Sequence, residues 1–146
     1  MSKIIDVKTG ELTIKEPAMV VSNKTILSDF EGFKDLKFFK RQGKKLEYVR
    51  CTIGMVAIGE NKCRPTFYFE KERLYMIQFS ICLQGGWENW SEETQKKVKE
   101  CNDAWLLKII GKKPPYKYKW GRISSVFDIK SGSSDIFIVY PENRSK

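Results

Sequence analysis

The sequence contains no histidine among its 146 residues. Without an imidazole the chain has no histidine acid or base, no Ser-His or Cys-His nucleophile pair and no histidine-ligated metal. It also lacks a glycine-rich phosphate loop and any cluster of acidic and cysteine residues with metal-ligand spacing. We therefore expect a protein that is not an enzyme and that uses no cofactor or metal.

Long hydrophobic runs are missing as well. Residues 76–87 carry no charge, but they include Gln78, Ser80 and Gln84 and are too few to span a bilayer, which takes about 20 apolar residues. The first six residues show no apolar core of a secretory signal. The sequence thus predicts neither a transmembrane segment nor a membrane partner.

The four cysteines are widely spaced, and no Cys-x-x-Cys pair occurs. They are Cys51, Cys63, Cys82 and Cys101. Three of them lie in apolar periodic segments, where a free cysteine packs as a small hydrophobic side chain. We expect all four to be free thiols, in a protein of the reducing cytoplasm.

The fold prediction rests on hydrophobic periodicity. With 41% hydrophobic residues, a chain of this length can bury a core of its own, so we expect a single domain over residues 1–146. Apolar residues alternate, or β-branched and aromatic residues gather, in segments that we expect to be strands: 4–7, 12–14, 49–57, 67–69, 74–83, 116–127 and 136–140. Residues 46–83 leave no room for crossover helices, so the sheet should be mainly antiparallel.

Two segments have helical spacing. Residues 91–110 begin at the N-cap Ser91 and end before Gly111, and the stripe Val98, Cys101, Trp105 and Ile109 should face the sheet. Residues 24–33 should form a short helix packed on the same sheet. The predicted fold class is therefore α+β.

The net charge of +9 is localised in two segments. Residues 34–50 hold seven basic and two acidic residues, and residues 108–122 hold six basic residues and no acidic one. A concentration of positive charge indicates an acidic partner, either nucleic acid or an acidic protein, although it also occurs on solvated surfaces without a partner.

The aromatic residues near the second basic segment argue against nucleic acid. In a strand, Tyr116, Tyr118 and Trp120 share one face, while Lys117 and Lys119 share the other. A single-strand binder needs stacking rings and cations in one groove. The pattern therefore favours a half-buried strand whose aromatic side chains enter the core.

The candidate partner-binding residues are the cations of these segments and two tryptophans that precede the long helix. Tryptophan is favoured at interfaces, although Trp87 and Trp90 could equally belong to a loop that packs onto the core. The full set is Lys37, Lys40, Arg41, Lys44, Lys45, Trp87, Trp90, Lys112, Lys113, Lys117, Lys119 and Arg122.

Residues 84–140 resemble small uncharacterised bacterial proteins of the contact-dependent and polymorphic toxin immunity type. The resemblance is carried by Trp87, Ser91, Trp105, Leu106, Tyr118, Trp120, Gly121, Ser124, Ser125, Asp128, Lys130, Ser131, Gly132, Ser134, Ile136, Ile138 and Tyr140. It implies a protein that neutralises a cognate toxin by direct binding. The basic charge departs from that of nuclease inhibitors, which are usually acidic, and points either to a toxin domain with an acidic surface or to binding away from a nucleic-acid groove.

We therefore expect an intracellular, cytoplasmic protein-binding module, an immunity protein whose partner is a toxin domain. The alternative is a nucleic-acid-binding protein that uses residues 34–50 and 108–122.

Overall fold

The computed structural model describes residues 3–40, 48–81, 91–128, 130 and 132–144, apart from the side chains of residues 39 and 40. Its strands are β1 (Ile5–Asp6), β2 (Glu11–Ile14), β3 (Met19–Val21), β4 (Lys37–Lys40), β5 (Tyr48–Thr52), β6 (Val56–Ile58), β7 (Asn61–Cys63), β8 (Thr66–Glu70), β9 (Arg73–Phe79), β10 (Tyr116–Tyr118), β11 (Gly121–Asp128) and β12 (Ser133–Val139). Helix α1 spans Glu92–Ile110, and short 3-10 helices span Leu27–Phe30 and Pro141–Asn143.

The strands form one large sheet and two small ones, and every pairing is antiparallel. The large sheet has seven strands in the order β10-β11-β12-β9-β8-β5-β4. Strands β1, β2 and β3 form a three-stranded sheet, and β6 pairs with β7. The prediction of an α+β fold with a mainly antiparallel sheet and one long helix is confirmed.

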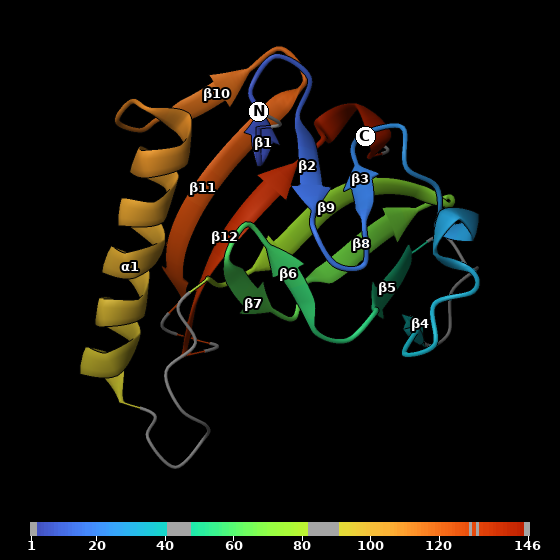
Figure 1. Cartoon of the computed structure of the whole chain (residues 1–146), viewed down its shortest axis with the longest axis horizontal. Coiled ribbons are helices and arrows are strands. Elements are labelled where there is room, and N and C mark those ends of the chain that lie inside the picture. Colours follow the sequence, from blue (N-terminus) through green and yellow to red (C-terminus); the bar gives the residue numbers. More distant parts are fainter. Residues whose placement is uncertain (1–2, 41–47, 82–90, 129, 131, 145–146) are drawn as a thin grey trace.

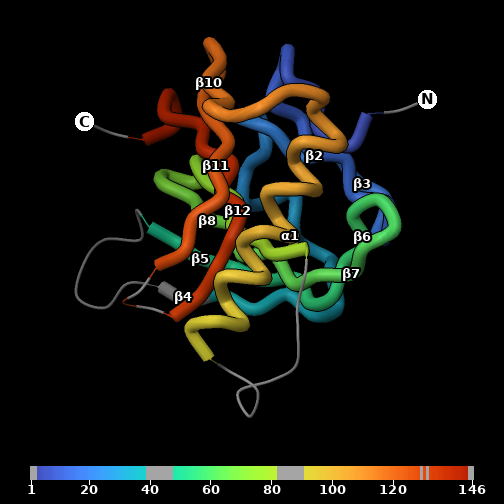
Figure 2. The backbone as a smooth tube through the Cα atoms, turned by 90° about the vertical axis from the view of Figure 1, so that its left-hand side faces the viewer, coloured from blue at the N-terminus to red at the C-terminus, as the bar shows by residue number. Residues whose placement is uncertain are grey.

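The small sheets and α1 lie on the same face of the large sheet (Figures 1 and 2). Two buried side chains tie the N-terminal hairpin to the large sheet. Trp120 Nε1 donates to the carbonyl of Val7 at 2.8 Å, and the hydroxyl of Tyr140 donates to the carbonyl of Gly10 at 2.6 Å. The opposite face of the large sheet is covered neither by α1 nor by the small sheets.

The core lies between these two layers. Phe30, fully buried, comes from the first 3-10 helix and makes edge-to-face contacts with Phe67 and Phe69 of β8, at ring-centroid distances of 4.7 and 5.5 Å. The other buried side chains of the core include Leu12, Ile14, Val21, Val56, Ile58, Ile77, Phe79, Ile136 and Ile138. Each strand thus directs alternate apolar residues inward.

Helix α1 begins and ends where the sequence indicates. The hydroxyl of Ser91 accepts the N–H of Thr94 at 3.0 Å, and Gly111, at φ 84°, closes the helix by donating to the carbonyl of Leu107 at 2.9 Å. Glu92 and Glu93 lie in the first turn, where the helix dipole favours acidic residues.

The buried stripe of α1 is rotated from the predicted one. Val98, Asn102 and Leu106 are buried, whereas Trp105 is half-buried and Cys101 is exposed. Asn102 belongs to this stripe because it binds the end of β9: its Oδ1 accepts the N–H of Ile81 at 3.0 Å, and its Nδ2 donates to Ser80 Oγ at 3.2 Å. The predicted stripe was composed of apolar residues only, so it did not include the polar Asn102.

The predicted short helix over residues 24–33 is wrong, since only the 3-10 turn Leu27–Phe30 forms there. The preceding residues are held extended by β9 and its turn. Leu74 donates its N–H to the carbonyl of Thr25 at 3.1 Å, and Leu27 donates to the carbonyl of Glu72 at 2.8 Å. Gly32, at φ 97°, then turns the chain away, so no room remains for a regular helix.

Two predicted strands are each divided. The segment 49–57 becomes β5 and β6 because Gly54 adopts φ 85°, a left-handed conformation that interrupts a strand. The segment 116–127 becomes β10 and β11, joined by a two-residue turn at Lys119 and Trp120. In 49–57 apolar alternation continues through Gly54, so the pattern does not reveal that break. In 116–127 the apolar positions change from even to odd numbers between Trp120 and Ile123, where the turn lies.

The prediction that all cysteines are free thiols is wrong for Cys101, which is disulfide-bonded. Cys51 and Cys63 are buried and free, and burial raises the pKa of each thiol to about 12, which keeps both protonated and unreactive. Cys82 lies outside the described residues.

Candidate binding site at the open edge of strand β11

Strand β11 is paired along its whole length on one side only. Its residues from Arg122 to Asp128 pair with β12. On the other side, β10 pairs with residues 121–123 only, through Tyr118↔Gly121, Lys117↔Arg122 and Tyr116↔Ile123. Among the described strands, none continues this pairing beside residues 124–128. This stretch is therefore an open sheet edge, which offers unpaired backbone donors and acceptors.

The edge stays open because of the two residues before β10. If the register of β10 and β11 continued, Pro114 would lie opposite Ser125, at a position whose backbone faces β11. Pro114 has no backbone N–H to donate there, so the ladder cannot continue beside residues 124–128. The chain between α1 and β10 passes through Pro114 and Pro115.

A cavity of about 390 Å³ lies beside this edge, between α1, the two prolines and the β10–β11 hairpin. Its wall is mainly apolar at Leu106, Tyr116 and Ile123. Ser125 also lines it, and the Oγ of Ser125 is buried without a hydrogen-bond partner among the described residues. The charged lining residues are Lys99, Asp103, Lys117 and Arg122.

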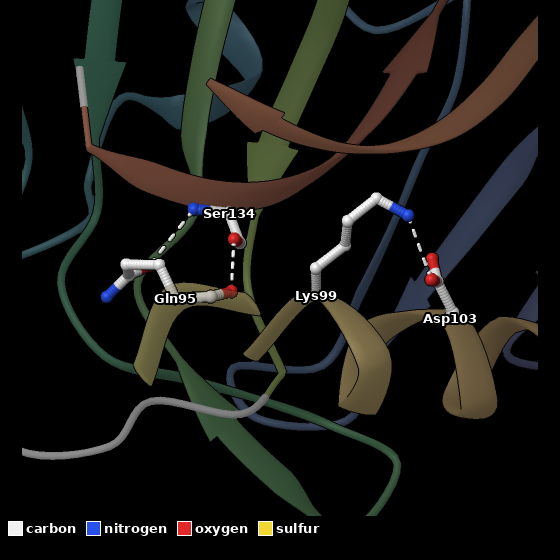
Figure 3. A network of polar contacts seen from close by, with 4 residues as sticks. All are labelled: Gln95, Lys99, Asp103 and Ser134. Carbon is white, nitrogen blue, oxygen red and sulfur yellow. Dashed lines mark hydrogen bonds and ion pairs between the residues drawn. The ribbon is translucent and has the colours of Figure 1, made fainter. Parts of the chain in front are cut away.

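Two of these four charges neutralise each other. Lys99 Nζ and Asp103 Oδ2 form an ion pair at 2.9 Å on α1, and both side chains rise from the helix toward the strands in Figure 3. One turn before Lys99, Gln95 fixes the helix against β12: its Oε1 accepts the N–H of Ser134 at 3.1 Å, and its carbonyl accepts the hydroxyl of Ser134 at 2.5 Å. The helical wall of the cavity is thereby anchored.

Lys117 and Arg122 remain as a pair of like charges. They are direct cross-strand partners in the β10–β11 hairpin, and both are exposed. Within the described part of the chain, neither forms an ion pair with a carboxylate. Like charges opposite each other on two strands destabilise the pair. An anionic group placed between them would remove this repulsion.

Other predicted cations surround the same end of the sheet. Lys112 and Lys113 follow α1, Lys119 lies in the hairpin turn, and all three are exposed. The ammonium of Lys112 lies 5.2 Å from the centre of the Tyr118 ring. A second depression, on the other side of β10, is lined by Val7, Lys8, Lys117, Tyr118, Lys119 and Trp120.

The first basic segment is not part of this site. Lys37, which is exposed, and Lys40 belong to β4, at the edge of the large sheet opposite to β10. With neighbouring strands about 4.8 Å apart, the two edge strands are separated by about 29 Å along the sheet. The side chain of Lys40 and the residues Arg41, Lys44, Lys45, Trp87 and Trp90 lie outside the described part of the structure.

The predicted segregation of aromatic and basic side chains is confirmed. Tyr116 and Trp120 are buried, Tyr118 is half-buried and stacks on Trp120 at 5.4 Å between ring centres, and Lys117 and Lys119 are exposed. The hydroxyl of Tyr116 donates to the carbonyl of Lys112 at 2.9 Å. Of these three rings, only that of Tyr118 is partly exposed beside the lysines.

The sequence analysis missed a polar network on the uncovered face of the large sheet. The hydroxyl of Tyr68 donates to Gln78 Oε1 at 2.5 Å, and Gln78 Nε2 donates to Asp135 Oδ2 at 3.1 Å. The same carboxylate oxygen accepts the hydroxyl of Ser133 at 2.9 Å. Burial raises the pKa of both Tyr68 and Asp135 above the ordinary values. Polar residues at outward positions of β9 and β12 are the signal that marks this network in the sequence.

None of the helices formed by the described residues is long and apolar enough to cross a bilayer. Among the same residues, no group of three or more His, Cys, Asp and Glu side chains could hold a metal ion.

A comparison of the chain with protein-family models found no match, and comparisons with curated proteins and with solved structures found none either.

Proposed function

We propose that this chain is a non-enzymatic protein-binding module that neutralises a cognate bacterial toxin domain, and that the partner presents an acidic surface to the β10–β11 hairpin. The observation that carries the proposal is the cross-strand pair Lys117 and Arg122. Both cations are exposed, lack a carboxylate partner among the described residues and adjoin an apolar cavity. Positive charge around a central apolar surface resembles the arrangement of protein interfaces, in which a rim of charge surrounds an apolar centre.

Nucleic acid is the less favoured partner. The rings of Tyr116 and Trp120 are buried and Tyr118 stacks on Trp120, so only one half-buried ring lies beside the cations, whereas a single-strand binder stacks successive bases on several rings. The two basic segments also lie at opposite edges of the large sheet and do not form one continuous groove.

The proposal places the protein in the cytoplasm. An exposed disulfide at Cys101 would be reduced there, because thiol systems keep cytoplasmic cysteines reduced. Alkylation of the protein in intact cells, followed by mass spectrometry, tests this. A fully oxidised Cys101 in the cell would assign the protein to an oxidising compartment.

Growth protection tests the function itself. A candidate toxin domain, sought in the gene next to this one, is expressed in a bacterial host with and without the full chain, and we expect the chain to restore growth. The double variant Lys117→Glu, Arg122→Glu should lose protection, whereas Lys37→Glu, at the opposite edge, should retain it.

Two results would overturn the proposal. One is a failure of the unaltered chain to protect. The other is tight binding of random-sequence RNA that falls steeply with salt, which would assign these cations to phosphate contacts.

A further inference from the structure

We infer that the open edge of β11 at residues 124–128 receives an extended segment of the partner, which adds a strand to the large sheet and alternates acidic and apolar residues. This inference rests on the proposed function, because it specifies how the toxin domain is bound. Strand addition to an exposed edge is an established mode of peptide recognition, in which main-chain hydrogen bonds provide affinity and alternate side chains provide specificity.

The first argument is that this edge is unprotected. Proteins usually blunt an exposed edge with lysine, proline or a bulge. Residues 124–128 read Ser-Ser-Val-Phe-Asp and contain neither lysine nor proline, and their pairing with β12 is regular. By contrast, β4 and β10, at the two ends of the large sheet, carry Lys37, Lys40 and Lys117.

The second argument concerns backbone direction. A two-residue turn makes Tyr118 and Gly121 the hydrogen-bonded pair that closes the β10–β11 hairpin. Because N–H and C=O groups alternate sides along a strand, Ser125 and Phe127 continue the parity of Gly121 and Ile123. Their backbone groups thus face the open edge, while Ser124 and Val126 face β12.

The third argument is space. An added strand would lie about 4.8 Å from β11, in line with β10, and would begin where Pro115 turns the chain away. This line runs beside the cavity of about 390 Å³. The Oγ of Ser125, which is buried and has no hydrogen-bond partner among the described residues, lies in its wall.

The fourth argument specifies the side chains. Those on the α1 side of the added strand would enter the apolar part of the cavity at Leu106 and Ile123. Those on the other side would approach Arg122 and Lys117, whose charges have no acidic partner among the described residues. A segment that alternates apolar and acidic residues matches both sides.

The test uses the full chain and a synthetic peptide of about nine residues that alternates valine and glutamate, a length typical of strands. We expect saturable binding, which is measured by the change in the amide chemical shifts of residues 124–128. N-methylation of every second residue removes the backbone N–H groups along one edge of the peptide strand. Two such peptides can be made, one methylated at the valines and one at the glutamates. Only the peptide that is methylated on the edge facing β11 should fail to bind. Lysine in place of glutamate should abolish binding as well.

Two variants at one position separate the backbone from the side chain. Ser125→Pro removes the N–H that faces the open edge and leaves the pairing with β12, so peptide affinity should fall by about tenfold or more, or about 1.4 kcal/mol. Ser125→Ala removes only the Oγ and should change affinity by less than about threefold. Thermal unfolding of both variants verifies that they are folded.

The outcomes distinguish this inference from the proposed function. If Ser125→Pro protects cells from the toxin as well as the unaltered chain does, the edge inference fails and the proposed function stands. If the unaltered chain gives no protection but binds the peptide with the expected pattern, the function fails and the edge inference stands. Equal binding of both methylated peptides, or self-association that Ser125→Pro abolishes, overturns the edge inference.

Discussion

The indole ring of Trp120 lies directly against the backbone of Gly10. A Cβ at residue 10 would lie 2.6 Å from Cδ2 of the ring, closer than any normal contact. The same indole donates to the carbonyl of Val7, which lies in the same turn between β1 and β2 as Gly10. One tryptophan therefore fastens the small three-stranded sheet to the β10–β11 hairpin, and a glycine makes that approach sterically allowed.

Gly10→Ala should destabilise the protein by about 2–4 kcal/mol, because the added Cβ overlaps the indole and because φ 81° is unfavourable for alanine. Gly32→Ala is the matched control: its φ of 97° is also left-handed, but no atom lies within 4 Å of the added Cβ. Gly32→Ala should lower the free energy of unfolding by only about 1 kcal/mol. Urea unfolding of both variants measures the difference, and equal losses would show that Trp120 does not limit this position.

Glu72→Gly should stabilise the protein by about 1 kcal/mol. Lys71 and Glu72 form the two-residue turn between β8 and β9 with φ of 50° and 69°, a turn in which glycine is preferred. The Leu27 N–H to Glu72 carbonyl bond uses only backbone atoms and is retained. The same substitution at Glu100, exposed within α1, should instead destabilise by about 1 kcal/mol. If both substitutions changed the free energy of unfolding in the same direction, the turn assignment would be contradicted.

Asp135 should make the stability of the protein depend on pH. Burial raises its pKa, while the hydrogen bonds from Gln78 and Ser133 lower it in part. A carboxyl with a higher pKa in the folded state binds its proton more tightly there, so stability should fall as pH rises from about 4, the unfolded pKa, through the folded pKa. Asp135→Asn should remove this fall, which unfolding at a series of pH values would measure.

Gln78→Leu provides the second arm of that experiment. It removes one donor to the carboxylate, so the fall in stability should extend to higher pH than in the unaltered protein. An identical pH profile for the unaltered protein and Asp135→Asn would show that this carboxyl ionises freely in the folded state.

Asn102→Ala should lower the free energy of unfolding by about 2–4 kcal/mol. It leaves the N–H of Ile81 and the hydroxyl of Ser80 without their partner at a fully buried position. Glu100→Ala, exposed on the same helix, should change stability by less than about 0.5 kcal/mol. A comparably small loss for Asn102→Ala, measured by urea unfolding, would mean that water replaces the amide.

Local signals predicted the parts of the fold that depend on neighbouring residues. The limits of α1 follow from Ser91 and Gly111, whose capping bonds reach only three or four residues along the chain. The division of residues 49–57 at Gly54 could not be predicted, because Val49, Cys51, Ile53 and Ala57 keep the alternation of one continuous strand. Gly54 interrupts the strand at φ 85°, and β6 then pairs with β7 instead of with the large sheet.

For the candidate site, the sequence predicts which side chains are exposed but not where they lie in the sheet. Lys117, Lys119 and Arg122 were expected to be exposed, because a charged side chain is costly to bury without a partner. Their role at an open edge depends on strand order, which places β10 beside part of β11 and places the other basic segment at the far edge. Such long-range pairings leave no trace in the spacing of residues along one chain.

The position of β12 governs how the large sheet can assemble during synthesis. This strand is the last of the described strands in the sequence, yet it lies between β11 and β9 and is the link between the two parts of the sheet. The β10–β11 hairpin and the β4–β5–β8–β9 meander can each form earlier on the ribosome, but they remain unconnected until residues 133–139 emerge. Because contacts over such long sequence separations slow folding, the edges of β9 and β11 that later pair with β12 stay exposed on the nascent chain until that moment.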